Sequence, residues 1–134
     1  GEEKNLTLFE EHSVFTKEEA NARKTILLEQ YLGTVEMEVH CMVNMIKSAV
    51  IPSCKAAAVD FATATAAVAT LESAWKAIEE LGDLYAQAAA ARTLRLETMV
   101  AVRGDIDALE GEVPESDWAL ASYRELLFLD THPF

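Results

Sequence analysis

The sequence contains few residues that form turns and few that carry positive charge. Five Gly and three Pro in 134 residues are too few for a turn-dense β-sandwich or a disordered linker protein. Eleven Lys and Arg stand against 23 Asp and Glu, which gives a formal net charge of −12. Contacts with phosphates or anionic lipids need a surplus of basic side chains, so this balance excludes general nucleic-acid binding and disfavours a membrane surface. No apolar run approaches the roughly 20 residues needed to span a bilayer.

Cysteine is also scarce, since Cys41 and Cys54 are the two in the chain. If both lie on one helix, a rise of about 1.5 Å per residue places them roughly 20 Å apart. A disulfide needs Cα atoms within about 7 Å. We therefore expect two free thiols, both buried as small apolar residues, and a cytoplasmic or otherwise reducing compartment.

Hydrophobic residues make up 51% of the chain, and they recur every three or four positions, as on one face of a helix. The first predicted stripe consists of Leu28, Leu32, Val35, Val39, Met42, Ile46 and Ala49. The second consists of Phe61, Ala64, Val68, Leu71, Trp75 and Ile78. The third consists of Tyr85, Ala89, Leu96, Met99, Val102, Ile106 and Leu109. No segment of useful length alternates with period two, so we predict no strand.

Capping and breaking residues mark the ends of these helices. Thr16 followed by Glu19 is typical of a capping box at a helix start. Gly82 followed by Asp83 predicts a helix end and then a new N-cap. Pro52 removes one backbone hydrogen bond inside the first long helix, which leaves a kinked helix and a broken one both open. The three residues before it carry no turn signal, so a kink is favoured.

Shorter helices are expected towards both ends of the chain. Leu6–His12 can form a helical turn, and Ser116 or Asp117 can cap a last helix that ends at Leu129. We therefore predict an all-α fold in which residues 1–134 form a single helical domain. Its core is an antiparallel bundle of long helices. This bundle is a helical hairpin whose first arm is kinked or broken at Pro52, and short terminal helices are added to it.

Small residues on one helix are predicted to face large ones on its neighbour. Residues 56–69 contain eight Ala, and residues 86–91 contain five. A turn between the second and third helices places Trp75 opposite Ala88 and Ala89, which is the complementarity that a dense core requires. We therefore expect Ala89→Leu to destabilise the fold through overpacking, by about 1–3 kcal/mol.

The sequence assigns no catalytic, cofactor-binding or metal-ligating residue. Glu36 and His40 are four residues apart and predict a surface ion pair rather than the Glu-x-x-His motif of a di-iron bundle. His12, His40 and His132 lack the spacing of a ligand cluster. Cys41 follows His40 directly, and neighbours in a helix do not face each other.

An acidic run is one of two features that suggest docking. Six carboxylates and no basic residue lie between Asp105 and Asp117, several of them in the last turns of a helix, where the macrodipole disfavours anions. Either this is a solvated loop, or it is a docking edge for a basic surface. The spacing lacks the Gly of an EF-hand loop, which makes a divalent cation a weaker alternative. The acids that define the edge are Asp105, Asp107, Glu110 and Glu112.

The second feature is the crowding of large apolar side chains in the last seventeen residues. Either several of them close the bundle, or some are exposed for contact with another portion of a longer chain. The crowded residues are Trp118, Tyr123, Leu126, Leu127, Phe128, Leu129 and Phe134. The interface candidates among them are Trp118, Tyr123, Leu127 and Phe128.

Two stretches of the chain carry a family pattern. The first runs from Leu8 to Thr16 and continues through Leu27–Tyr31 to Pro52. The second comprises Asp107–Glu110, Trp118 and Tyr123–Phe128. Together they resemble the C-terminal helical domain of type III glutamine synthetases, while the Ala-rich middle matches only as generic helix. One departure is that Ala and Leu stand beside the Trp, where the family typically has prolines.

This resemblance implies a parent enzyme that makes glutamine from glutamate, ammonia and ATP with magnesium or manganese. It also implies a ring-based homo-oligomer in the cytoplasm. The catalytic and nucleotide-binding residues of such enzymes lie upstream of this domain, so no position here inherits them. The implied partners are the catalytic region of the parent chain and neighbouring subunits. The alternative is a free-standing interaction or sensor bundle with a ligand near Tyr31, Cys41 and Met45.

Overall fold

A computed structural model describes residues 3–128, without the side chains of Tyr123 and Arg124. The described residues form helices and no strand, which confirms the predicted all-α class. One continuous helix of 40 residues comprises α2 (Lys17–Met45), the π-helical turn η1 (Ile46–Val50) and α3 (Ile51–Ala56). A second, of 27 residues, comprises α5 (Leu84–Thr93), the π-helical turn η2 (Leu94–Thr98) and α6 (Met99–Glu110). Between them lies α4 (Ala62–Glu79), and the shorter elements are α1 (Glu3–Glu11), the 3-10 turn η3 (Glu115–Asp117) and α7 (Tyr123–Leu127).

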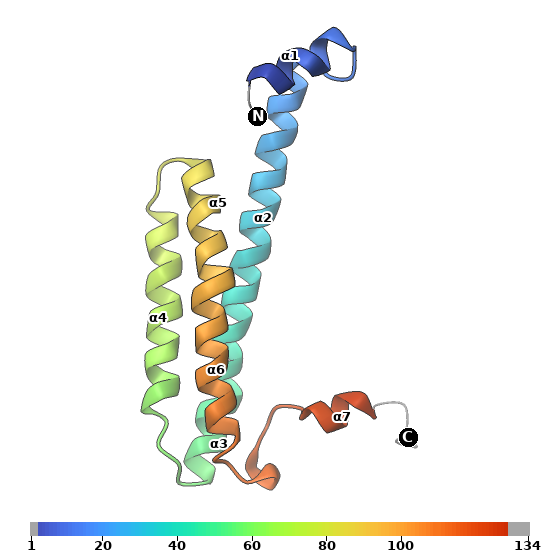
Figure 1. The fold of residues 1–134 in the computed structure, drawn as a ribbon. Helices are drawn as coiled ribbons and strands as arrows, with labels where there is room; N and C mark the ends of the chain where they lie inside the picture. Colours follow the sequence, from blue (N-terminus) through green and yellow to red (C-terminus); the bar gives the residue numbers. More distant parts are fainter. Residues whose placement is uncertain (1–2, 129–134) are drawn as a thin grey trace.

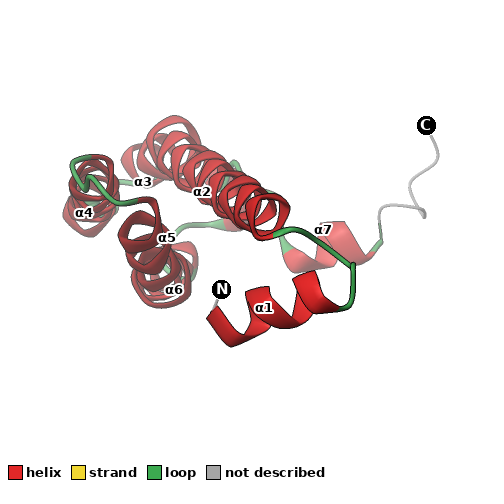
Figure 2. Ribbon diagram, turned by 90° about the horizontal axis from the view of Figure 1, so that it is seen from above, coloured by secondary structure: helices red, strands yellow, loops and turns green. Residues whose placement is uncertain are grey.

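The long helices form a three-helix bundle in which α4 runs antiparallel to both of its neighbours (Figure 1). Seen end-on, the two continuous helices and α4 occupy the corners of a triangle (Figure 2). The N-terminal part of α2 extends beyond the hairpin of α4 and α5 and carries α1 at its far end. At the opposite end of the bundle, the chain after α6 turns away and places α7 to one side.

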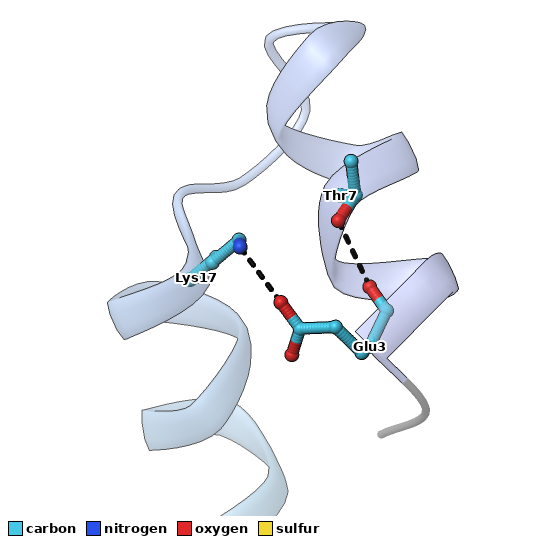
Figure 3. A network of polar contacts seen from close by, with 3 residues as sticks. All are labelled: Glu3, Thr7 and Lys17. Carbon is cyan, nitrogen blue, oxygen red and sulfur yellow. Dashed lines mark hydrogen bonds and ion pairs between the residues drawn. The ribbon is translucent and has the colours of Figure 1, made fainter.

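The junction between α1 and α2 confirms the predicted capping box. The Glu19 N–H donates to Thr16 Oγ1 at 3.2 Å, and the Thr16 N–H donates to Glu19 Oε2 at 2.8 Å. The backbone and side-chain hydrogen bonds from Thr16 hold the pKa of Glu19 below its ordinary value. Lys17 Nζ donates to Glu3 Oε1 at 2.8 Å, and Thr7 Oγ1 donates to the Glu3 carbonyl at 3.1 Å (Figure 3). The bond between Lys17 and Glu3 joins α1 to the start of α2.

The helix passes through Pro52 without breaking. The N–H of Ile51 bonds to the carbonyl of Ile46, five residues earlier, so a wide π-type turn comes directly before the proline. This turn makes room for the proline ring, which in a regular α-helix clashes with the carbonyl four residues back. The break comes later, after Ala56, where Ala58 adopts a left-handed φ of 56°. Of the two alternatives left open by the sequence, the broken arm at Pro52 is wrong.

The core confirms the first two predicted stripes, because every member of both is buried or half-buried. The C-terminal half of the third is confirmed as well, since Val102, Ile106 and Leu109 are buried and Met99 is half-buried. Its N-terminal half is wrong: Tyr85, Ala89 and Leu96 are exposed, whereas Ala88, Ala91 and Leu94 are buried. The cause is η2, in which the Met99 N–H bonds to the Leu94 carbonyl. This wide turn holds an extra residue, so the buried face before it shifts by one position.

The shift moves the site of overpacking from Ala89 to Ala88. Ala88 is 7% exposed, whereas Ala89 is exposed, so the effect predicted for Ala89→Leu is wrong. We now expect Ala88→Leu to lower the free energy of unfolding by about 1–3 kcal/mol. Ala89→Leu is the matched control and should change it by less than about 0.5 kcal/mol. Urea denaturation of both variants measures this, and equal effects would contradict the observed register.

Candidate functional site

An open groove of about 650 Å³ lies between the two continuous helices and the C-terminal segment. The first continuous helix contributes Glu38, Cys41, Met42, Met45, Ile46 and Val50 to its lining. The second contributes Met99, Arg103, Ile106, Asp107 and Glu110. The third wall consists of Trp118, Leu120, Ala121 and Leu126. Three segments that are far apart in the sequence therefore build one concave surface.

The groove is mostly apolar and rich in sulfur. Three of the four methionines of the chain line it, and the Sγ atom of Cys41 lies 3.9 Å from the Sδ atom of Met45. Thioether side chains are flexible and polarisable, so a surface built from them adapts to apolar groups of different shapes. The fourth, Met37, is exposed on α2 and does not line the groove.

Charged side chains lie along the rim. Glu38 Oε1 accepts from Arg95 Nη2 at 2.6 Å, which joins the two long helices. Asp107 Oδ1 accepts from Arg103 Nε at 3.1 Å along α6. Glu110 is half-buried at the C-terminal end of the same helix. Three carboxylates and one guanidinium group belong to the lining, so it carries more negative than positive charge.

The structure brings only part of the predicted acidic edge into this site. Asp107 and Glu110 line the groove, whereas Asp105 and Glu112 are exposed and do not. Among the described residues, no three His, Cys, Asp or Glu side chains are grouped so that they could hold a metal ion. Only Asp107 and Glu110 of the predicted edge therefore border the groove.

The apolar tail divides into a packed part and an exposed part. Trp118 and Leu120 pack against the core. Leu127 is 78% exposed and Phe128 is 52% exposed. The side chain of Tyr123 lies outside the described residues, as do Leu129 and Phe134. Trp118 and Leu120 thus pack onto the bundle, while Leu127 and Phe128 are exposed. Contact of the exposed part with another portion of a longer chain stays a prediction.

The cap predicted for the last helix at Ser116 or Asp117 is wrong. Both residues lie in the 3-10 turn η3, and Ser122 caps α7 instead. The Glu125 N–H donates to Ser122 Oγ at 3.3 Å, and the Ser122 N–H donates to Glu125 Oε2 at 2.8 Å. The predicted end at Leu129 lies outside the described residues.

Ser53 anchors the third wall of the groove. Its side chain is buried, and its Oγ accepts a hydrogen bond from the Ala119 N–H at 3.0 Å. Ser53→Ala leaves that N–H without its acceptor, so we expect the free energy of unfolding to fall by about 1–3 kcal/mol. Ser48→Ala is the control, because the exposed Ser48 Oγ donates to the Asn44 carbonyl of its own helix. Thermal unfolding followed by circular dichroism compares the two, and equal midpoints would contradict the anchoring role.

The other residues considered in the sequence analysis lie away from the groove or differ from what was expected. His40 and Glu36 form the predicted surface pair, with Nε2 and Oε1 3.9 Å apart. Both cysteines are free as predicted, but only Cys54 is buried, and the burial expected for Cys41 is wrong because it lies on the groove. Tyr31 does not line the groove and packs against the core instead. In the described part of the chain, no helix combines the length and apolarity needed to cross a bilayer.

Comparison with known proteins gives one family. A family model described as "Glutamine synthetase C-terminal domain" matches residues 1–69, just over half of the chain. The matched part comprises α1, the first continuous helix and the N-terminal half of α4. It therefore includes one wall of the groove, while the other two walls lie beyond it. No curated protein matches the chain.

Proposed function

Because the chain belongs to the family of glutamine synthetase C-terminal domains, we propose that it is the non-catalytic accessory domain of a type III glutamine synthetase. Its task in this proposal is to support assembly, by packing on the catalytic region of its own chain or on a neighbouring subunit. The parent reaction joins ammonia to glutamate with ATP. The described carboxylates do not converge on a point that fits ATP-bound magnesium or manganese, so we assign those groups to the catalytic region and not to this domain.

The observation that carries the proposal is the exposed apolar surface at the C-terminal end of the bundle. Leu126, Leu127 and Phe128 are each more than half exposed, and Leu126 also lines the apolar groove. Contiguous apolar surface of this kind is typical of protein–protein contacts. Homo-oligomeric enzymes use such patches repeatedly through symmetry, which fits the ring assembly that the family resemblance implies.

The test uses the full enzyme that carries this domain. We expect Leu127→Ser combined with Phe128→Ser to shift the enzyme towards smaller assemblies in mass photometry. Met37→Ser is the control, because Met37 is 68% exposed on α2 and lies outside the groove. The isolated chain should form no glutamine in a coupled assay. Glutamine formation by the isolated chain, or equal masses for the double variant and the control, would contradict the proposal.

The groove also favours a second candidate, a free-standing sensor bundle. Its volume of about 650 Å³ lies within the range of small-molecule sites, and two of the three residues expected near a ligand, Cys41 and Met45, line it. The two candidates differ in solution behaviour. An accessory domain should self-associate through its exposed apolar tail, whereas a sensor should be a defined monomer or dimer at all concentrations and gain thermal stability from a small apolar ligand. Sedimentation velocity over a concentration series separates them.

A further inference from the structure

We propose that the groove between α2 and α6 binds an amphipathic helix whose apolar face is bordered by Lys and Arg. The proposed occupant is thus a basic, amphipathic segment of a protein. We rely on the proposed function only for its source, which is the catalytic region of the parent enzyme. Three features of the groove support this occupant, namely its length, its lining and its charge.

The length of the groove matches a short helix. On the first continuous helix its lining runs from Glu38 to Val50, and on α6 it runs from Met99 to Glu110. At a rise of about 1.5 Å per residue, these two walls are each about 17 Å long. Three turns of α-helix have the same length. Two parallel helical walls with an apolar floor are the usual setting for a third helix that lies lengthwise between them.

The lining suits the apolar face of such a helix. Met42 and Met45 are three residues apart on one wall, and Met99 lies on the other. Trp118 and Leu126 close the third side. Flexible thioethers can adapt to Leu, Ile or Phe side chains that arrive every three or four residues. Met45 is 43% exposed, so part of this apolar surface is open to a partner.

Charge complementarity selects a basic helix. The lining carboxylates Glu38, Asp107 and Glu110 outnumber the single lining cation, Arg103, which is paired with Asp107. Arg95, outside the lining, is paired with Glu38, so three acidic groups stand against two basic ones. The whole chain has a net charge of −12, and a field of this sign attracts a basic segment and repels an acidic one.

Direct binding to the 134-residue chain tests this proposal. The probe is a fluorescein-labelled 14-residue peptide with Leu at helical spacing and Lys on both flanks, and binding is followed by fluorescence anisotropy. The control peptide keeps every Leu and replaces every Lys with Glu. We expect the Lys peptide to bind at least about tenfold more tightly than the Glu peptide, and its affinity to fall as salt is added. Equal affinities of the two peptides, or no binding of the Lys peptide, would overturn the proposal.

A pair of variants locates the binding site. Met45→Lys places a charge inside the groove, and Met37→Lys places the same charge on the same helix outside it. We expect Met45→Lys to weaken binding of the Lys peptide by about tenfold or more and Met37→Lys by less than about twofold. Circular dichroism checks that both variants are folded, and Met45→Ala replaces Met45→Lys if the latter is not. Equal weakening by the paired variants would overturn the assignment of the groove.

Two further outcomes separate this proposal from its alternatives. If the chain alone forms a dimer that Met45→Lys dissociates, the occupant is a second copy, and the basic-helix proposal is wrong. If the Lys peptide fails to bind while Leu127→Ser with Phe128→Ser still disrupts the full enzyme, the groove proposal fails and the assembly function stands. If the Lys peptide binds the 134-residue chain but the double variant leaves the mass of the full enzyme unchanged, the groove proposal is supported and the assembly function is contradicted.

Discussion

Replacing Leu71 with alanine should lower the free energy of unfolding by about 3–5 kcal/mol. Leu71 has 0% of its surface exposed and lies in the middle of α4, among the core residues of all three long helices. Its truncation removes apolar contacts and leaves a cavity, because close-packed neighbours relax only partly. A domain of this size has a total stability of about 5–15 kcal/mol, so one substitution removes a large share.

Leu127→Ala is the matched control for this prediction. It makes the same chemical change at a leucine that is 78% exposed, where little apolar contact is lost, and should shift the stability by less than about 0.5 kcal/mol. Urea denaturation followed by far-UV circular dichroism measures both variants. If Leu71→Ala and Leu127→Ala unfold at the same denaturant concentration, the core is not packed as described.

The two thiols should differ in their rate of alkylation by about a hundredfold or more. Cys41 is exposed, whereas Cys54 has 0% of its surface exposed. Burial also raises the pKa of the Cys54 thiol, so near pH 8 a smaller fraction of it is the reactive thiolate. A reagent therefore reaches Cys54 only when the bundle opens, while Cys41 reacts in the native state.

Mass spectrometry of a time course with iodoacetamide distinguishes the two sites. Cys41→Ser should leave a protein that is alkylated slowly, and Cys54→Ser should leave one that is alkylated quickly. In concentrated urea the two rates should converge, because the difference arises from the fold. Similar rates for the two single-cysteine variants in native buffer would show that Cys54 is not in the core.

Most of the fold follows from helical periodicity and capping. The stripes through Val35 and Val39 and through Leu71 and Trp75 identify core faces, because a regular α-helix keeps a spacing of 3.6 residues. The third stripe fails before Leu94, because a π-type turn changes that spacing locally and no residue type there signals it. The same kind of turn carries the helix through Pro52. Residue propensities alone cannot decide whether a helix kinks or breaks at a proline.

The candidate site was predictable only in its parts. The acidic run and the apolar tail are visible in the sequence, and Asp107, Glu110 and Trp118 do line the groove. The groove itself is not visible, because Met45 and Met99 come together only when the hairpin closes and the C-terminal segment folds back to Ser53. One available clue was that Cys41 and Met45 widen the first stripe beyond what a core face needs.

Sedimentation velocity of the full enzyme, with and without residues 1–134, tests the assembly role most directly. If this helical domain supports assembly, the shortened enzyme should contain fewer subunits per particle, and the isolated domain should form no glutamine. The same number of subunits per particle in the shortened and the complete enzyme would contradict this account.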